Sequence, residues 1–373
     1  MLSLFPHLHL TLGALALSPL TSVVMSLGKQ SRPVSTSSAK RAIPEPRPSA
    51  SIMVISARNE VLLLHRVGSS TSFASAHVFP GGNLDSFHEG ANVAGPESPE
   101  KHRDGPAYRL GAIRECFEET GILLALNSTD GRLVNLSSET RDEARRNIHQ
   151  NKVVFGDWVA SLGAVPDTDN LVPFTRWITP PPLKKRFTTQ MYLYFLPISS
   201  TSPSEMLIPT PDGGIEHTAA LFAPAARWLS QASTGDIILF PPQYYLLTLL
   251  ARFLVGPGAG LEEGPAHCTA QRRRLVAFLR RVPTAQVDKE HPTAKIPWAD
   301  KVISPYHILI RRDGRVVLGL EKPGLELEDT QRGGDMERVI LVKPGSNGPQ
   351  GVEVQRRVNV LEEERAADEQ SKL

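Results

Sequence analysis

The segment "GAIRECFEETGILL", residues 111–124, contains three glutamates within five positions of an otherwise apolar stretch. On an α-helix, Glu115, Glu118 and Glu119 are three and four residues apart, so their carboxylates project from one face. Gly121 stands where a left-handed residue would end such a helix. The segment therefore predicts a helix with one acidic face and one apolar face.

The acidic face has two explanations. Carboxylates at this spacing repel one another unless cations neutralise them, and hard divalent cations such as Mg²⁺ bind carboxylates together with the phosphates of a substrate. Alternatively, the glutamates lie on a solvated helix face, because glutamate favours helices and is common on their surfaces. The cluster alone does not distinguish a metal site from such a face.

The composition limits the classes of function. The 373 residues include 41 basic and 39 acidic side chains, so a formal charge of +2 gives no electrostatic reason to propose a nucleic-acid partner. Only two cysteines occur, Cys116 and Cys268, which argues against a disulfide framework and favours a reducing compartment. No apolar run approaches the roughly 20 residues of a membrane-spanning helix.

The composition also changes along the chain in a way that predicts its organisation. Strand-like runs begin near residue 51, Gly/Pro-rich stretches separate the later elements, and Asp313-Gly314 between two apolar runs predicts a hairpin. The predicted parts are an extension over 1–49, a main domain over 50–255 with a loop-like insertion at about 86–106, a linker and helix over 256–300, a β-rich appendage over 301–360, and an unstructured tail over 361–373.

The two ends carry features of targeting signals. The first 50 residues are rich in Ser, Pro and Leu and have no acidic residue before Glu45, so they resemble an organelle presequence, with a mitochondrion as one destination. A disordered extension, or a start at Met25, explains them equally well. The chain finishes in Ser371-Lys372-Leu373, which is typical of the address that the peroxisomal import receptor binds.

The motif "RECFEETGI", residues 114–122, follows Gly81-Gly82 and fills the second half of the Nudix box. The chain therefore resembles the Nudix hydrolase superfamily. The first half of the box departs from the pattern, because 31 residues separate Gly82 from Arg114. The spaced glutamate of the box falls at His88, so it is absent in register, and the neighbouring Glu89 is a candidate to replace it.

The stretches "AHVFPGGNLD", "RWITPPPLKKRF" and "ILFPPQYY", together with the C-terminus, resemble the peroxisomal coenzyme A diphosphatase branch of this superfamily. The resemblance implies an α/β/α sandwich around a mixed sheet. It also implies that Glu115, Glu118 and Glu119, with the backbone at Gly82, hold Mg²⁺ or Mn²⁺. Arg114 is expected to orient these carboxylates by charge-assisted hydrogen bonds.

Further site residues are expected from the same resemblance. Glu216 is a candidate catalytic base or extra metal ligand, with a surface glutamate as the alternative. Arg66 is a candidate to bind a substrate phosphate, with a solvated arginine at a strand end as the alternative. Lys185 and Arg186, beside Lys184, are candidates to bind the 3′-phosphate of coenzyme A, although a solvated turn explains them as well.

The resemblance implies hydrolysis of coenzyme A or acyl-CoA to 3′,5′-ADP and 4′-phosphopantetheine or its acyl derivative. Two alternatives stay open. The same chemistry could act on NADH, ADP-ribose or another nucleoside diphosphate derivative. The chain could instead be a non-catalytic Nudix-fold binding module, although such modules usually lack the glutamates that are present here.

Overall fold

The computed structural model describes residues 43–68, 74–95, 98–181, 183–198, 209–212, 216–256, 264–346 and 348–370. The predictions for residues 1–42 and for Ser371-Lys372-Leu373 lie outside this part of the chain. Within it, no helix combines the length and the apolar character needed to cross a membrane.

The described residues form three sheets, of which the largest has eight strands. In this larger sheet, β10, β7, β8, β1, β2 and β3 lie side by side in that order. The central strand β1 runs parallel to β8 and antiparallel to β4 and β2, and β9 pairs with β2, so the sheet is mixed. The strands are β1 Arg47–Ile55, β2 Val61–Arg66, β3 His77–Val78, β4 Gly81–Asn83, β7 Val172–Ile178, β8 Phe187–Phe195, β9 His217–Ala223 and β10 Val302–Ile303.

A four-stranded sheet follows later in the chain, and a short pair of strands lies near α3 and α4. The bounds are β11 Tyr306–Ile310, β12 Val316–Leu320, β13 Asp335–Lys343, β14 Gln350–Arg356, β5 Ala125–Asn127 and β6 Ala164–Pro166. The α-helices are α1 Ser86–Glu89, α2 Pro106–Thr120, α3 Ser138–His149, α4 Phe155–Ser161, α5 Ala225–Thr234, α6 Pro241–Ala251, α7 Gly264–Arg280 and α8 Arg357–Gln370.

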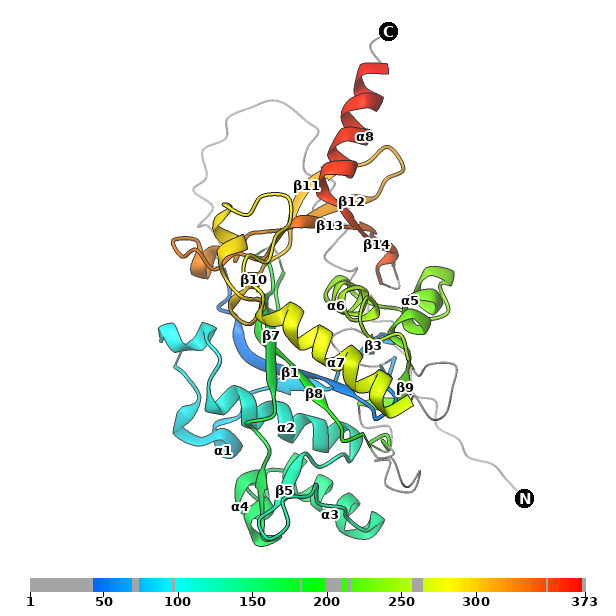
Figure 1. Ribbon diagram of the computed structural model, residues 1–373. Coiled ribbons are helices and arrows are strands. Elements are labelled where there is room, and N and C mark those ends of the chain that lie inside the picture. The colour runs from blue at the N-terminus through cyan, green and yellow to red at the C-terminus, as the bar shows by residue number, and fades with distance from the viewer. Residues whose placement is uncertain are drawn as a thin grey trace, which may run out of the picture.

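Helices cover both faces of the larger sheet because β1 is apolar on both sides. Ile52 and Val54 pack into one buried cluster with Phe117 of α2. Met53 and Ile55, which point the other way, pack into a second cluster together with side chains of α6 and α7. Figure 1 shows α2 below the sheet and α6 above it. The predicted α/β/α sandwich is therefore confirmed.

The loop predicted for residues 86–106 is wrong in its described part. This stretch contains α1 and two 3₁₀ helices, η1 Gly90–Asn92 and η2 Pro99–His102. Lys101 and His102 are buried, and the fully buried Arg176 of β7 donates a hydrogen bond to the carbonyl of Lys101 at 3.4 Å. The stretch is ordered because it packs on the end of β7 and β8.

The unstructured tail predicted from residue 361 is also wrong as far as Gln370, because α8 continues through it. Arg311, just beyond β11, forms ion pairs with the consecutive residues Glu363, at 2.9 Å, and Glu364, at 2.8 Å. Val360 is fully buried against β13 and β12. These ion pairs and the burial of Val360 stabilise α8. The charged sequence by itself did not predict this helix.

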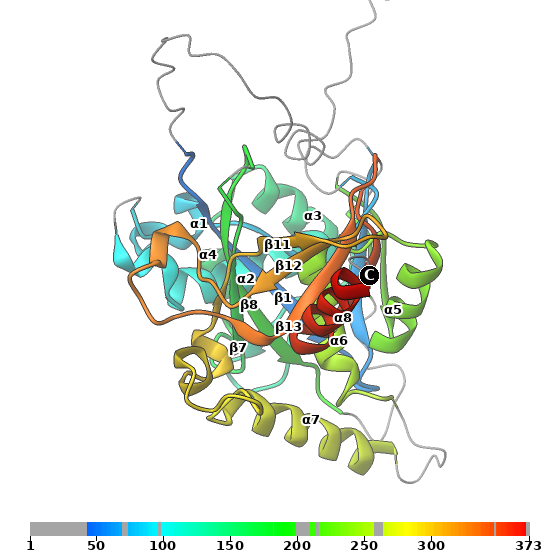
Figure 2. The ribbon, with the colours of Figure 1, turned by 90° about the horizontal axis from the view of Figure 1, so that it is seen from above.

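The predicted β-rich appendage is present as the sheet β11–β14, and it shares a core with the main domain. Figure 2 shows this sheet and α8 lying over the larger sheet and α6. Ile340 and Leu320 belong to the same buried cluster as Tyr245 of α6. The Tyr245 hydroxyl donates to Asp335 at 2.7 Å, and Arg338 pairs with the same carboxylate at 2.8 Å.

We expect Tyr245→Phe to lower the free energy of unfolding by about 2 kcal/mol, because it removes a buried hydrogen bond to a charged acceptor. Urea unfolding followed by circular dichroism measures this difference. Tyr244→Phe is the matched control, since the Tyr244 hydroxyl bonds to none of the residues that the structure describes. Equal effects of the two substitutions would contradict the assigned role of the Tyr245 hydroxyl.

Candidate active site

Helix α2 carries the three box glutamates, and its acidic face lies against the Gly81-Gly82 segment at the start of β4. Pro106 occupies its first turn, and Gly121 ends it in the left-handed conformation (φ 72°), with its N–H bonded to the Phe117 carbonyl at 2.8 Å. The apolar side of the helix is buried against β1 and β2. The predicted end of this helix at Gly121 and its predicted apolar face are therefore confirmed.

A buried arginine holds two of the three glutamates. The Arg114 guanidinium, 5% exposed, donates from Nη1 to Glu115 at 3.0 Å and to Glu118 at 2.7 Å. Its Nε donates to Glu89 at 2.8 Å, and its Nη2 donates to the carbonyl of Asn83 at 2.9 Å. These contacts match the orienting role predicted for Arg114, and they place the guanidinium where it does not face solvent.

Glu89 takes the position that the missing box glutamate would fill. Its side chain is fully buried, pairs with Arg114, and accepts a hydrogen bond from the backbone N–H of Asp85 at 2.6 Å. The register of the box pointed to His88, whose ring instead bonds to Asn151 and to the backbone of Phe155. The only sequence signal for Glu89 was its position one residue from the expected one.

The glycine pair lies between β1 and α2, where a side chain would meet β1 at Gly81 and the Glu115 carboxylate at Gly82. A Cβ on Gly82 would stand 2.5 Å from Oε1 of Glu115, and a Cβ on Gly81 would stand 2.4 Å from the Ala50 carbonyl oxygen. The Gly81 N–H donates to Glu119 at 2.8 Å. The Gly81 backbone therefore positions Glu119, and the role of the Gly82 backbone in holding a metal stays a prediction.

A second group of side chains lies at the start of β9, next to Glu119. One ligand atom from each of Glu119, Glu216 and His217 lies within 4.8 Å of the others. The pairing of β2 with β9 sets Arg66 opposite His217, and Arg66 forms an ion pair with Glu216 at 3.0 Å. The structure thus brings the predicted Glu216 and Arg66 to the box glutamates, and it adds His217, which sequence reasoning missed.

The site carries more negative charge than its arginines balance. Burial raises the pKa of Glu115 to about 7 although Arg114 opposes the shift. Burial and then the neighbouring Glu115 raise the pKa of Glu119, although the Gly81 N–H lowers it. Five carboxylates, those of Glu89 and Glu216 and of the three box glutamates, gather here, and four of them form ion pairs with Arg114 or Arg66. This oxygen-rich, electron-rich donor set fits a divalent cation.

Two basic side chains of α3 also reach the box helix. His149 lies 3.3 Å from Glu118, and its side chain is 47% exposed. Arg145 donates to the backbone carbonyl of Glu118 at 2.8 Å and to the Thr210 hydroxyl at 3.2 Å. No sequence motif indicated either residue, because α3 is brought to α2 only by packing.

The two candidates for binding the 3′-phosphate lie away from this site. The Arg186 side chain is 1% exposed, and it bonds to the carbonyls of Thr179 and Pro44 and to Glu326 at 2.6 Å. The predicted role of Arg186 as a substrate contact is therefore wrong, because its guanidinium is buried among protein acceptors. Lys185 is exposed in the turn before β8.

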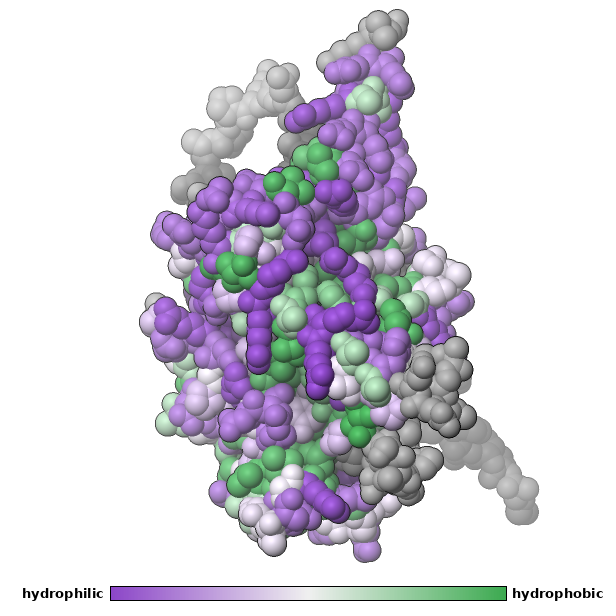
Figure 3. All heavy atoms as spheres, viewed as in Figure 1, coloured by the Kyte–Doolittle hydropathy of each residue, from purple (hydrophilic) through white to green (hydrophobic). Residues whose placement is uncertain are grey.

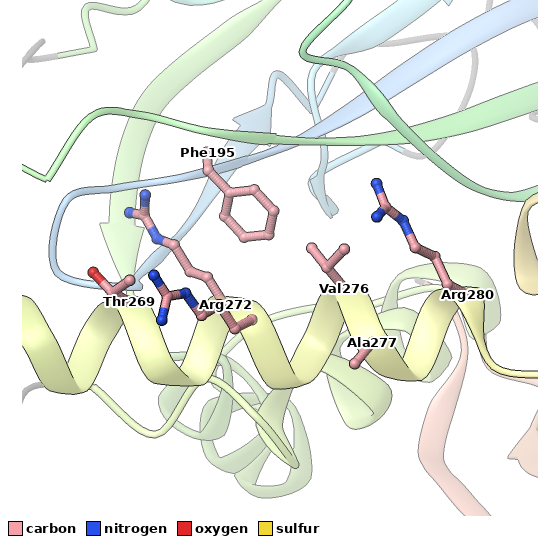
Figure 4. Close-up of a pocket in the computed structure, with 7 residues that line it drawn as sticks. Phe195, Thr269, Arg272, Val276, Ala277 and Arg280 are labelled. Carbon is pink, nitrogen blue, oxygen red and sulfur yellow. The ribbon is translucent and has the colours of Figure 1, made fainter.

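A groove of about 510 Å³ runs along α7, on the opposite side of the sheet from α2 (Figure 4). Arg272 and Arg280 flank an apolar floor that includes Phe195 and Val276. Figure 3 shows strongly hydrophilic side chains beside apolar ones over α7. None of the predicted site residues lines this groove, so it is separate from the carboxylate site.

The chain is similar to several known proteins. The family model described as the NUDT19 Nudix domain matches residues 92–250. The acyl-coenzyme A diphosphatase NUDT19 of Gallus gallus is 28% identical over 239 residues, covering 52% of this chain and 61% of the relative. The protein of the same name from Xenopus laevis is 26% identical over 236 residues, covering 52% and 60%.

Two further proteins are also similar. The putative nudix hydrolase 7 of Caenorhabditis elegans is 26% identical over 204 residues, covering 54% of this chain and 59% of the relative. Among solved structures, a NUDIX hydrolase from Alicyclobacillus acidocaldarius aligns with a TM-score of 0.46 at 24% identity, covering 57% of this chain and 94% of that one.

The box glutamates on α2, the glycine turn against them and the family model matched over residues 92–250 are features of the Nudix hydrolases, the class that this chain resembles. Within that class it resembles the NUDT19 acyl-coenzyme A diphosphatases. The chain spans about three fifths of the length of these relatives, between 59% and 61%.

We expect Glu89→Ala to destabilise the protein by about 3 kcal/mol, because it removes one of the three carboxylates that pair with the buried Arg114. Urea unfolding measures the loss. The control is Glu100→Ala, which removes a pair with Arg103 at 3.8 Å in which both side chains are 63% exposed, and it should change stability by less than about 1 kcal/mol. A small effect at Glu89 would show that Arg114 does not depend on it.

Proposed function

We propose that the chain hydrolyses the diphosphate link of coenzyme A or acyl-CoA, giving 3′,5′-ADP and 4′-phosphopantetheine or its acyl derivative. The observation that carries the proposal is the group of box carboxylates held by Arg114 against the Gly81-Gly82 backbone. Two of the relatives are named acyl-coenzyme A diphosphatases, which favours this substrate class over other nucleoside diphosphate derivatives.

The donor set suits Mg²⁺ or Mn²⁺, held by Glu115, Glu118 and Glu119 with the backbone at Gly82. Bound there, such ions would neutralise charge on the diphosphate and lower the pKa of water, as divalent cations do in phosphoryl transfer. Arg114 keeps two of the carboxylates in place by hydrogen bonds and does not touch the substrate. In the reaction, water adds to one phosphorus and the P–O bond of the anhydride link breaks.

The residues around Glu216 complete the proposed site. Of the two roles predicted for Glu216, the extra ligand suits the geometry better, because its carboxylate shares a 4.8 Å cluster with Glu119. Arg66 pairs with Glu216 at 3.0 Å, which sets its guanidinium beside the carboxylates, and we propose that it contacts a substrate phosphate from there. Lys185 stays a proposed contact for the distal phosphate on the strength of its exposure alone.

We expect Glu118→Gln to abolish turnover, since it removes a charge from the cation-binding face while keeping the shape of the side chain. Purified full-length protein is incubated with coenzyme A and Mg²⁺ or Mn²⁺, and the products are identified by mass spectrometry. Wild type should release 3′,5′-ADP and phosphopantetheine only when a cation is added. The control is Glu139→Gln, an exposed position in the first turn of α3, which should keep full activity.

Other results of this assay would change the proposal in defined ways. Cleavage of NADH or ADP-ribose in place of coenzyme A would keep the chemistry and overturn the substrate. Inertness towards all three, with an intact fold, would favour a binding module. Cleavage that persists in Glu118→Gln would overturn the assigned role of the box helix.

We further propose that the chain acts in the peroxisome, because Ser371-Lys372-Leu373 matches the address bound by the import receptor. A fluorescent protein fused to the N-terminus of the chain should colocalise with a peroxisomal marker. The same fusion without residues 371–373 should lose that pattern. Unchanged colocalisation after their removal would refute the signal, and mitochondrial fluorescence of the chain tagged at its other end would favour the N-terminal extension.

A further inference from the structure

His217 is a buried polar side chain that the box does not explain. Its side chain has no exposed surface, and its Nε2 has no hydrogen-bond partner within the part of the chain that the structure describes. A ring nitrogen that is buried without a hydrogen-bond partner is unfavourable unless a ligand satisfies it. This nitrogen lies 3.6 Å from Oε1 of Glu119, on the side where the carboxylates gather.

Asp212 fixes which ring nitrogen carries the proton. Its carboxylate lies 3.3 Å from Nδ1 of His217 and also accepts the backbone N–H groups of Glu216, at 2.8 Å, and of His217, at 3.1 Å. A carboxylate only accepts hydrogen bonds, so a ring nitrogen bonded to one bears the hydrogen of a neutral ring. Of the two carboxylates beside the ring, that of Asp212 is the nearer, at 3.3 Å from Nδ1 against 3.6 Å between Nε2 and Glu119, so the hydrogen is assigned to Nδ1 and the lone pair to Nε2.

A histidine held on one side by a carboxylate, with its other nitrogen free, is the usual arrangement of a metal-bound histidine. The ligand atoms of Glu119, Glu216 and His217 lie within 4.8 Å of one another, a spread that donor atoms around one cation can have. Arg66 pairs with Glu216 from the outside and so keeps that carboxylate beside the ring.

We propose that Nε2 of His217 is a nitrogen ligand of a divalent cation shared with Glu119 and Glu216, and that Asp212 orients the ring for this purpose. The inference rests on the proposed function, because it adds a nitrogen ligand to the cation that the box carboxylates would hold. Mg²⁺ favours oxygen ligands, whereas imidazole suits first-row transition metals. The site therefore prefers Mn²⁺, or a comparable transition ion, to Mg²⁺.

The test is pulsed electron paramagnetic resonance on the Mn²⁺-loaded full-length protein, which detects a nitrogen nucleus bonded to the ion. Wild type should show the modulation of a coordinated imidazole nitrogen. Labelling only the histidines with ¹⁵N should change that modulation, and this measurement needs no variant that has to fold. His217→Leu should abolish the nitrogen signal and weaken Mn²⁺ binding by about tenfold or more, with a smaller effect on Mg²⁺ binding.

Three further variants separate the explanations. Asp212→Asn, which keeps the shape of the orienting side chain, should weaken Mn²⁺ binding by about 10-fold to 100-fold and alter the nitrogen signal. His149→Leu should keep the signal, although His149 also lies near a box glutamate. His307→Leu, on an exposed position of β11, should match wild type throughout.

The outcomes of the proposed function and of this inference are distinguishable. If the protein binds Mn²⁺ and shows no coordinated nitrogen, the inference fails while a carboxylate-held cation stands. If the nitrogen signal disappears in His149→Leu and persists in His217→Leu, the inference fails and the ligand is His149. If the wild-type protein binds no Mn²⁺ at all, the cation required by the proposed function fails as well.

Discussion

The guanidinium of Arg114 is the constraint on which the candidate site depends. It is nearly excluded from water and bonds to three carboxylates and a backbone carbonyl, which uses its fixed fork of donors almost completely. A buried charge of this kind is costly unless its partners are held in place. Glu89 belongs to α1 and the Asn83 carbonyl to β4, so the Arg114 side chain ties both elements to α2.

The insertion within the box is compatible with this arrangement because it starts after Glu89 and rejoins the chain at α2. Between these points the described residues do not form a loose surface loop. The backbone at Lys101 bonds to Arg176, whose guanidinium also lies 4.4 Å from the Tyr108 ring, at the start of α2. The residues between Glu89 and α2 therefore add contacts to the sandwich, while Glu89 and Arg114 meet at 2.8 Å.

The carboxylates of the site form two groups, one around Arg114 and one at the start of β9, and Glu119 lies between them. Arg114 neutralises the carboxylates on the N-terminal side of the box, whereas Glu119 faces the Gly81 backbone and His217. The second group is supplied by β9, which is paired with β2 and so brings the Glu216 and His217 pair alongside Arg66. A site assembled from a helix and the ends of paired strands is held more rigidly than one built on loops, which suits the alignment of a cation with a diphosphate.

The sequence by itself determined the features that depend on neighbouring residues. The period of the apolar positions predicted α2, the position of Gly121 predicted its end, and the spacing of the glutamates predicted one acidic face, because a helix repeats every few residues whatever surrounds it. The resemblance of "RECFEETGI" to the Nudix box then implied the sandwich, which needed no knowledge of distant contacts.

Tertiary structure alone decided which distant side chains complete the site. Glu89 stands one residue out of register, and only the packing of α1 shows that its carboxylate meets Arg114. Arg186 belongs to a basic run that predicted a solvent-facing patch, yet the fold buries its guanidinium against backbone carbonyls and Glu326. His217 reaches Glu119 because β9 pairs with β2 in one register. The two strands are far apart in the sequence, so their register is set by how both faces of the sheet pack and not by neighbouring residues.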